Sequence, residues 1–448
     1  MSYFSIHNHS EYSNIRLIDS VNKTEDLINR ALELDLKGVC LTDHEALCGS
    51  KLFLNHYNKL SDEVKANFKV GLGNEIYLVD ELGNGPYFHF LLLAKDDKGF
   101  RGLKELSSIA WEQSYYATGM ERVPLLKSQL AEVMKEYKGH IIGSTACLGG
   151  EADKLCLEIT HWLSIGDRNK ANETYLKLAD FVHWCQDIFG KEDFYLEVQP
   201  GGSGKAQHEV NKLLYSFKDR LSAKIIFTTD SHMLCKEDRE CHKIYLQSKE
   251  GDREVDSFYE TAYMMSFDEI KSYLLTDFTI DEIEEMRLNT LEIYDKIEGY
   301  NLDRVQRIPS RKDLKDYPPI DEFKEYKYLN KMLMSDSIQD RYWGNRCIEG
   351  LKEKGIYDEV HIDRIDKEAE VLWEISKGFE DRMTAYYNTM EKIIDLTWEA
   401  GSIVGPGRGS AVGFLSSYCL DITQIDPIPY NLSYERHLSQ GRVELPKP

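Results

Sequence analysis

The sequence has no apolar run approaching the roughly 20 residues needed to cross a bilayer. Its opening residues, MSYFSIHNHS, lack the basic and then apolar pattern of a signal peptide. The nine cysteines are odd in number and include no C-x-x-C pair, so neither a disulfide framework nor a zinc ribbon is indicated. These absences predict a cytoplasmic protein with no membrane partner.

The chain also lacks an excess of positive charge. Its 55 Lys and Arg against 77 Asp and Glu give a formal net charge of -22, whereas contacts to phosphate need local positive charge. This balance does not exclude an enzyme of DNA, because basic side chains can cluster locally and acidic ones also gather around metals. With 448 residues and 42% apolar content, the chain has room for two or three domains with buried cores.

From the start to about residue 235, short apolar runs alternate with amphipathic stretches, which is typical of successive βα units around a parallel sheet or barrel. The predicted strands are Tyr3 to Ile6, Gly38 to Leu41, Val70 to Leu72 running on toward Ile76, Phe88 to Leu93, His140 to Gly143, Phe194 to Val198 and Ile225 to Thr228. The spacing of apolar residues predicts helices at Thr24 to Leu36, Leu125 to Tyr137, Ala171 to Phe189 and Lys205 to Leu221.

After about residue 265 the sequence changes to long, charged helical stretches, of which 281–297 and 336–354 are the clearest. The prolines of residues 308–319 break helices and predict a connector. We therefore expect an α/β domain over residues 1–270 and a mostly helical domain over residues 271–448.

Ligand-type side chains follow the ends of the predicted strands, where barrel and doubly wound folds place their active sites. His7 and His9, two apart in an extended segment, project to the same side and can reach one ion. Later strands contribute Asp43, His44, Glu75, His89, Cys147, Asp230 and His232. Each alone could be a packed core residue, but structural residues have no reason to recur at one end of consecutive strands. Such a set suits Zn²⁺, Mn²⁺ or Fe²⁺ better than Ca²⁺.

These residues carry a resemblance to a known superfamily. The motifs His7-Asn8-His9-Ser10, Thr42-Asp43-His44 and Asp230-Ser231-His232, with Glu75, His89 and Cys147, resemble those of the PHP (polymerase and histidinol phosphatase) superfamily, and Asp19 resembles the aspartate that completes its first motif in polymerases. The resemblance implies a distorted barrel of seven βα units. It also implies nine metal ligands: His7, His9, Asp19, His44, Glu75, His89, Cys147, Asp230 and His232. Of these, His7, His9, His44, Glu75, Asp230 and His232 are expected to carry catalysis, with Asp43 supporting His44.

A second motif, GPGRGSAVG, covers residues 405–413. It could be a turn before a helix, but closely spaced glycines let backbone N–H groups approach phosphate, Arg408 can donate a bidentate fork, and Ser410 can cap the following helix. It is not a Walker loop, since no Gly-Lys-Ser/Thr follows.

With the downstream segments 422–427, 430–432, 435–438 and 442–446, this motif is similar to the palm signature of bacterial DNA polymerase III alpha subunits. The resemblance implies that residues 271–448 begin a palm domain. In it, Gly407, Arg408, Gly409 and Ser410 would hold the triphosphate of the incoming nucleotide.

In that family an Asp-x-Asp pair that binds two magnesium ions follows directly, and this chain stops at Pro448 before it. We therefore expect that the chain does not polymerise DNA alone and that Mg²⁺ belongs only to the missing palm site. A second polypeptide of a split, phage-type gene would supply the rest. A remnant in which only the PHP domain works is the alternative.

The leading hypothesis is the N-terminal part of a DNA polymerase III alpha subunit whose PHP domain is a metal-dependent 3′-to-5′ exonuclease. Its partners would be DNA, through the primer 3′ end, and dNTP. Two alternatives remain: a PHP-family phosphoesterase such as histidinol phosphatase, which the palm signature disfavours, and a noncatalytic scaffold that braces the polymerase, which the complete ligand set disfavours.

Overall fold

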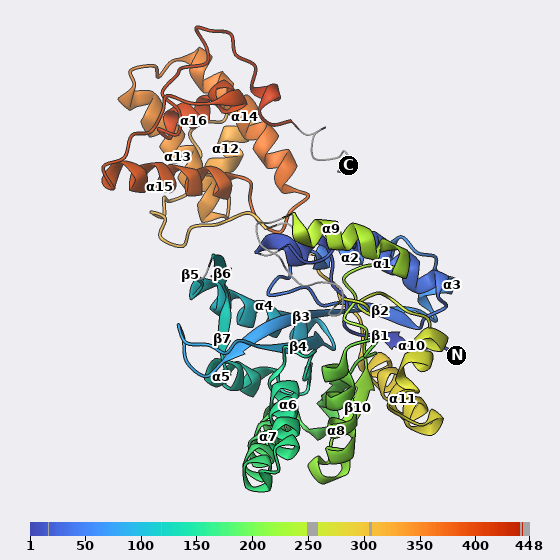
Figure 1. Cartoon of the computed structure of the whole chain (residues 1–448). Helices are drawn as coiled ribbons and strands as arrows, with labels where there is room; N and C mark the ends of the chain where they lie inside the picture. The colour runs from blue at the N-terminus through green and yellow to red at the C-terminus, as the bar shows by residue number, and fades with distance from the viewer. Residues whose placement is uncertain (17, 118, 249–258, 304–306, 440, 442–448) are drawn as a thin grey trace. The chain divides into compact units, whose positions relative to one another are not determined.

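The computed structural model describes residues 1–16, 18–117, 119–248, 259–303, 307–439 and 441 (Figure 1). The chain forms two compact units, Met1–Leu302 and Asp303–Pro448. In the described part of the chain, no helix combines the length and the apolar character that a membrane crossing requires.

The first unit is built on an eight-stranded sheet with the path β1-β2-β3-β4-β8-β9-β10 and with β7 paired to β3. Its strands are β1 (Phe4–Ser5), β2 (Gly38–Leu41), β3 (Lys69–Val79), β4 (Phe88–Ala94), β7 (Pro124–Leu126), β8 (Ile141–Ser144), β9 (Phe194–Val198) and β10 (Lys224–Phe227). Neighbouring strands pair in parallel except β4, which runs antiparallel to both β3 and β8. A separate hairpin joins β5 (Tyr115–Ala117) to β6 (Met120–Arg122).

The two ends of this sheet meet just beyond β1 and β10. Asn8 and Ser231 form a parallel bridge there. The backbone N–H of His9 donates to the carbonyl of Ser231 at 2.9 Å, and that of Ser231 donates to the carbonyl of His7 at 3.2 Å. The sheet therefore closes on itself at one mouth, and the predicted α/β class with a distorted barrel is confirmed.

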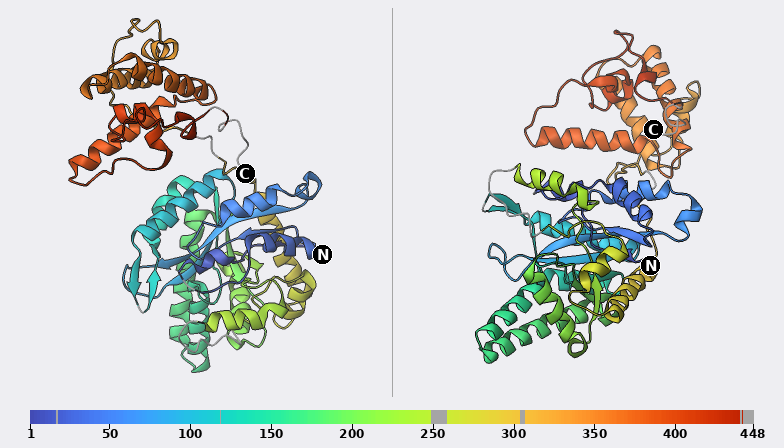
Figure 2. Two further views of the ribbon diagram at one scale, coloured as in Figure 1. Left: turned by 90° about the horizontal axis from the view of Figure 1, so that it is seen from above. Right: turned by 45° about the vertical axis from the view of Figure 1, so that its right-hand side comes forward.

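Helices surround this sheet in the first unit (Figure 2). They are α1 (Thr24–Glu33), α2 (Ser50–Asn58), α3 (Asp62–Lys65), α4 (Asp97–Glu112), α5 (Lys127–Tyr137), α6 (Glu151–Ser164), α7 (Arg168–Phe189), α8 (Lys205–Leu221), α9 (Arg239–Gln247), α10 (Phe267–Leu274) and α11 (Ile280–Lys296), with 3-10 turns η1 (Glu11–Ile15), η2 (Lys191–Asp193) and η3 (Lys236–Asp238). Because helices cover it, the sheet is buried almost throughout, which explains why its strands read as continuous apolar runs.

All seven predicted strands are present. The expectation of consecutive parallel βα units is wrong at β4, which is antiparallel, and the β5–β6 hairpin and β7 were not anticipated. The predicted helix at Leu125 begins later, at Lys127, because Leu125 and Leu126 pair with β3 as part of β7.

The first unit extends to Leu302, beyond the domain boundary predicted at residue 270. Helix α11 packs against β1 and β10, and its side chains Ile283 and Met286 belong to the core of the barrel. Capping boxes, Ser266 with Glu269 for α10 and Thr279 with Glu282 for α11, fix where the two helices begin.

The second unit is helical, as predicted. It contains α12 (Lys327–Leu333), α13 (Ile338–Glu353), α14 (Glu359–Ser376), α15 (Thr384–Glu399) and α16 (Leu415–Cys419), with 3-10 turns η4 (Gly409–Gly413) and η5 (Tyr434–Arg436). Its core gathers around the fully buried Trp343 and Phe414. The predicted connector, residues 308–319, contains neither helix nor strand.

Candidate metal centre

The predicted ligands converge at the mouth where the parallel strands end. Directly after β1, β2 and β10 come His7 and His9, His44, and Asp230 and His232. Glu75 lies within β3, which is longer than predicted, and the backbone N–H groups of Glu75 and Glu45 link it to the segment after β2. His89, at the start of β4, reaches the same mouth only because β4 is antiparallel.

Eight of the nine predicted ligands form three groups, in each of which one donor atom per residue lies within 4.8 Å of the others. The groups are His9, Asp19, His44 and His232; His7, His9, Glu75 and Asp230; and His44, Glu75 and His89. His9, His44 and Glu75 belong to two groups each, so the three groups form one continuous cluster.

The distances within the second group fit a bound divalent ion. The Nε2 atom of His9 lies 3.1 Å from Oε2 of Glu75 and 3.0 Å from Oδ1 of Asp230, and Nε2 of His7 lies 3.2 Å from both oxygens. All four atoms are buried and have no hydrogen-bond partner among the described residues, despite this proximity. Ligands about 2.1 Å from one six-coordinate ion stand about 3.0 Å apart, so the donor set fits a metal better than mutual hydrogen bonding.

The other ring nitrogens are held by the protein, which aims the free nitrogens at the cluster. Nδ1 of His232 lies 2.7 Å from the carbonyl oxygen of Asp230, to which it can donate, and its Nε2 lies 2.8 Å from Asp19. Nδ1 of His9 lies 3.0 Å from the hydroxyl of Ser13. Such outer contacts fix the tautomer and the orientation of metal-binding imidazoles.

Glu197 performs the same task for His7, and sequence reasoning missed it. Its fully buried carboxylate lies 2.7 Å from Nδ1 of His7 and accepts hydrogen bonds from the hydroxyls of Ser144, at 2.6 Å, and of Thr228. The available signal was a lone carboxylate in the otherwise apolar strand FYLEV, because a buried charge needs a partner.

Asp43 does not support His44 as expected. Its carboxylate accepts hydrogen bonds from the backbone N–H of Ser10, at 2.6 Å, and from the hydroxyl of Ser13, at 2.8 Å. Ser13 in turn contacts Nδ1 of His9. Asp43 therefore holds the turn after β1, and its link to the cluster runs through His9.

Three carboxylates of the cluster, on Asp19, Glu75 and Asp230, are buried. Burial alone would raise the pKa of Asp19 and Glu75, but the neighbouring imidazoles hold both well below the usual value. Burial alone would lower the pKa of His7 and His44, yet the surrounding carboxylates raise both well above the usual value. The buried carboxylates therefore favour positive charge beside them, which protons on the imidazoles supply here and divalent ions would supply in their place.

Cys147, which follows β8, borders the cluster but belongs to none of the three groups. Its Sγ lies 3.4 Å from Nδ1 of His89 and 3.9 Å from Oε1 of Glu75. Burial, reinforced by Asp230 and Glu75, raises the pKa of the thiol well above its usual value.

The cluster forms one wall of a pocket of about 320 Å³, here called the β6 pocket. Arg16, Tyr77, Tyr87 and Arg122 also line this pocket. The guanidinium of Arg122 lies 4.8 Å from the ring centre of Tyr87, and that of Arg16 pairs with the buried Glu45. Local basic side chains therefore stand beside the cluster in spite of the net charge of -22.

The glycine motif belongs to the second unit. Gly407 and Gly409 have positive φ angles of 136° and 63°, and a Cβ on Gly407 would lie 2.4 Å from Cγ1 of Val412. Arg408 is exposed and Ser410 is half-buried. Ser410 does not cap the following helix as expected.

The first N–H groups of α16 are occupied by another side chain. The buried carboxylate of Glu368 accepts from the backbone N–H groups of Leu415, at 2.7 Å, and Ser416, at 2.9 Å. The hydroxyl of Ser410 instead lies 3.3 Å from Nδ1 of His437. The last segment of the palm signature, residues 442–446, lies outside the described residues.

Comparison with known families matches both units. Residues 5–201 match the PHP domain, and residues 327–447 match the bacterial DNA polymerase III alpha NTPase domain. The first unit is thus similar to PHP domains, and the second unit is similar to a domain of bacterial DNA polymerase III alpha subunits. The resemblance found in the sequence is thus confirmed for both parts of the chain.

Similarity to individual proteins, which extends over the whole of this chain, agrees with these matches. Over 467 residues the chain is 37% identical to the probable DNA polymerase YorL of Bacillus subtilis and to a DNA-directed DNA polymerase of Bacillus phage SPbeta, covering 98% of this chain and 36% of each relative. It is 30% identical to the DNA polymerase III subunit alpha of Campylobacter jejuni, covering all of this chain and 35% of that protein. The chain therefore spans about a third of the length of these relatives.

Proposed function

We propose that this chain is the N-terminal part of a DNA polymerase of the DNA polymerase III alpha type and that its PHP domain removes nucleotides from the 3′ end of DNA. The observation that carries the proposal is the buried cluster of eight linked ligand candidates, which forms a wall of an accessible pocket containing two arginines. Divalent ions held there would activate water and neutralise the charge of the scissile phosphate.

The residues of the chain have distinct tasks in this proposal. His7, His9, His44, Glu75, Asp230 and His232 hold the ions and are catalytic, while Asp19, His89 and the bordering Cys147 complete the set. In the reaction, the oxygen of water bonds to phosphorus and the bond to the 3′ oxygen of the preceding nucleotide breaks. That oxygen takes a proton, and a deoxynucleoside 5′-monophosphate is released.

The test is hydrolysis of 3′-labelled primer-template DNA by the purified chain with Mn²⁺ or Zn²⁺, with and without a chelator. We expect loss of the 3′ nucleotide that stops with the chelator and in His9→Ala. His183→Ala, which removes an exposed histidine of α7, is the matched control and should behave as the unaltered chain does. Activity that survives in His9→Ala would refute the assignment.

A structural metal site is the second candidate, favoured by one observation. His7 and His9 flank Asn8, whose bridge to Ser231 closes the barrel, so ions bound there would also brace the fold. Metal that binds and stabilises the chain without any hydrolysis of DNA would select this candidate.

We further propose that Gly407, Arg408, Gly409 and Ser410 bind the triphosphate of an incoming dNTP in a palm domain. The backbone conformation of the two glycines and the exposure of Arg408 support this role. The chain spans about a third of its relatives, and polymerisation would need the sequence that they carry in addition. The arrangement that we propose is a split, phage-type polymerase in which a second polypeptide supplies that sequence. An adjacent reading frame that encodes an Asp-x-Asp pair and fingers would support the split arrangement, and its absence would refute it.

A further inference from the structure

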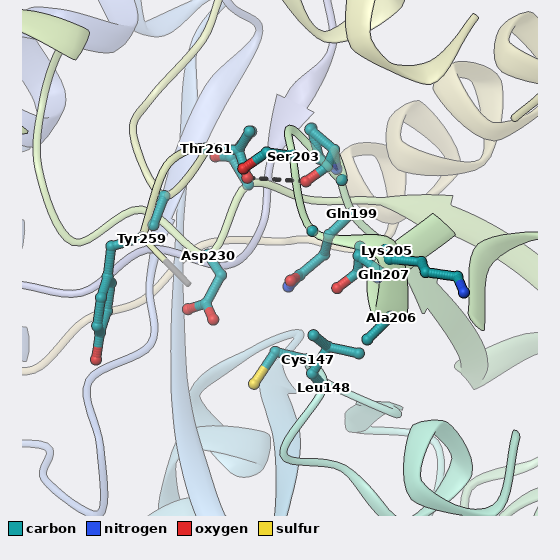
Figure 3. Close-up of a pocket in the computed structure, with 15 residues that line it drawn as sticks. Cys147, Leu148, Gln199, Ser203, Lys205, Ala206, Gln207, Asp230, Tyr259 and Thr261 are labelled. Carbon is teal, nitrogen blue, oxygen red and sulfur yellow. Dashed lines mark hydrogen bonds between the residues drawn. The ribbon is translucent and has the colours of Figure 1, made fainter. Parts of the chain in front are cut away.

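A second pocket, of about 340 Å³, opens on the cluster from the side of α8 and is here called the α8 pocket (Figure 3). It lies among the loop that follows β9, the first turn of α8 and the described residues 259–262. Asp230 and Cys147 form its wall toward the cluster. Its volume falls in the range of small-molecule sites.

The lining of the α8 pocket combines apolar surface with fixed amide groups. Leu148, Pro200 and Ala206 supply apolar walls, and Gln199 and Gln207 supply the amides. Small residues, among them Gly201, Ser203 and Thr229, and the ring of Tyr259 line the remaining sides. A flat heteroaromatic group with polar edges, such as a nucleobase, has the matching chemistry.

The two glutamines are already oriented by the protein. The amide nitrogen of Gln207 donates to Asn211 at 3.0 Å, and that of Gln199 donates to Glu197 and Thr228, each at 3.2 Å. The amide oxygens accept no hydrogen bond from the residues that the structure describes. They can therefore accept from the N–H groups of a base without rearranging.

The rim of the α8 pocket favours a phosphate. Helix α8 begins there, after Gly204, which has no side chain to cap it. Lys205 in the first turn is almost fully exposed, and its Nζ lies 3.6 Å from Oε1 of Glu209 on the same helix. The positive end of a helix and an ammonium group both attract anions. The buried carboxylate of Asp230, whose Oδ1 has no hydrogen-bond partner among the described residues, joins this rim to the ligand groups.

The α8 pocket and the β6 pocket meet at Cys147, Asp230 and Tyr259, which line both. The cluster is therefore open on two sides, through walls made of different elements. A phosphomonoester has one organic group on its phosphorus and needs one such space. A phosphodiester has two, and the paired pockets match it.

We propose that the α8 pocket holds the terminal nucleoside of a DNA strand while the β6 pocket holds the adjoining nucleotides, so that the centre selects phosphodiesters with a nucleoside on each side. This inference rests on the proposed nuclease function and names its subsites. In the β6 pocket, Tyr87 and Arg122 offer a stacked aromatic and cationic surface of the kind that binds single strands.

Binding of the reaction product tests the α8 pocket without measuring catalysis. The full chain is loaded with Mn²⁺ and titrated with dTMP in a calorimeter. In Ala206→Trp the added indole fills the pocket, and we expect at least a tenfold loss of dTMP affinity with unchanged metal content. Ser216→Trp places the same indole on an exposed site of α8 and should leave dTMP affinity within twofold.

A second variant guards against misfolding of Ala206→Trp. Lys205→Glu alters an almost fully exposed side chain, whose ion pair with Glu209 at 3.6 Å lies on the surface of α8, and should weaken dTMP binding about threefold to tenfold through charge repulsion. In contrast, Arg122→Ala should raise the KM for labelled DNA and leave the dTMP affinity unchanged. The two pockets would thereby be separated experimentally.

The outcomes distinguish this inference from the proposed function. If the metal-loaded chain does not bind dTMP, or if Ala206→Trp and Lys205→Glu both bind it normally, the α8 pocket is not the nucleoside site. If the chain binds dTMP with the expected pattern but never hydrolyses DNA, the nuclease assignment fails and the pocket assignment survives.

Discussion

Changing Glu197 to Gln should remove the contact that fixes the orientation and the tautomer of the His7 ring. The carboxylate faces four donors, on His7, Ser144, Gln199 and Thr228, of which the first two lie at 2.7 Å and 2.6 Å. The amide of Gln keeps the shape but replaces one accepting oxygen with an N–H₂ group. At least one donor then faces another donor inside a fully buried site.

Two losses of different size follow from this contact set. Hydrogen bonds to a charged acceptor contribute about 1.5–3 kcal/mol each, so the unfolding free energy should fall by roughly 3 kcal/mol. If the new N–H₂ group donates to Nδ1 of His7, the proton of the ring moves to Nε2, and that nitrogen can no longer bind metal. Loss of such an orienting contact lowers metal affinity about 10–100-fold, or about 1.4–2.8 kcal/mol.

The variant Ser144→Ala separates the loss of stability from the loss of metal affinity. It removes one hydrogen bond to Glu197 and leaves the contact between Glu197 and His7 in place. We expect this control to lose about 1–2 kcal/mol of stability and to keep its metal affinity within about threefold. Affinity is measured by competition with a chromophoric chelator for Zn²⁺, and stability by urea unfolding. If Ser144→Ala and Glu197→Gln lose metal affinity equally, the affinity follows the stability of the fold and does not depend on the contact between Glu197 and His7. That result would refute the orienting role of Glu197.

Three further predictions concern stability. Dialysis against EDTA should lower the thermal midpoint of the first unit by about 4 °C, because an ion at a hundred times its Kd contributes about 2.7 kcal/mol, and adding Mn²⁺ or Zn²⁺ should restore it; no change would indicate that nothing was bound. Asp153 is fully buried without a hydrogen-bond partner among the described residues, and burial raises the pKa of its carboxyl well above the usual value. The folded chain then holds this proton to higher pH than the unfolded chain does, so stability falls as the pH rises above about 4. Asp153→Ala should therefore raise the free energy of unfolding more at pH 8 than at pH 5, as measured by urea unfolding; an equal effect at both pH values contradicts this. In the second unit, Glu368→Ala should cost about 3–5 kcal/mol, since it removes the acceptor of the Arg364 Nε–H group and of the backbone N–H groups of Leu415 and Ser416, while metal content stays unchanged; a loss below about 1 kcal/mol in chemical unfolding would show that water replaces the carboxylate.

The strands and the ligand positions could be predicted from the sequence because both are local signals. A run such as Gly38 to Leu41 is apolar and bounded by polar turns, and His44 follows it directly. The direction of a strand relative to its neighbour has no such local signal, since the sequence pattern of a strand is the same in a parallel and in an antiparallel pair. The antiparallel direction of β4 was therefore missed, although the position of His89 at its start depends on it.

The boundary between the units and the role of Glu197 required long-range contacts. The apolar face of α11 shows that the helix packs on something, but not that its partners are β1 and β10. In the same way, a carboxylate within an apolar strand indicates that a polar partner is present, but the sequence does not show which residue that partner is. His7 lies 190 residues away along the chain, and only the closure of the sheet brings the two together.

That closure connects the fold to the chemistry. The side chain of Asn8 donates to the carbonyls of Ser5 and Cys40 and accepts from the hydroxyls of Ser5 and Ser231, so one buried amide ties β1 to β2 and to the end of β10. His7 and His9 flank Asn8 in the chain and cannot change position without breaking the hydrogen bonds of its side-chain amide. The two ends of the sheet thus meet at the residues that carry the ligands, and metal affinity becomes linked to barrel closure, because whatever holds the ends together also sets the spacing of the donor atoms.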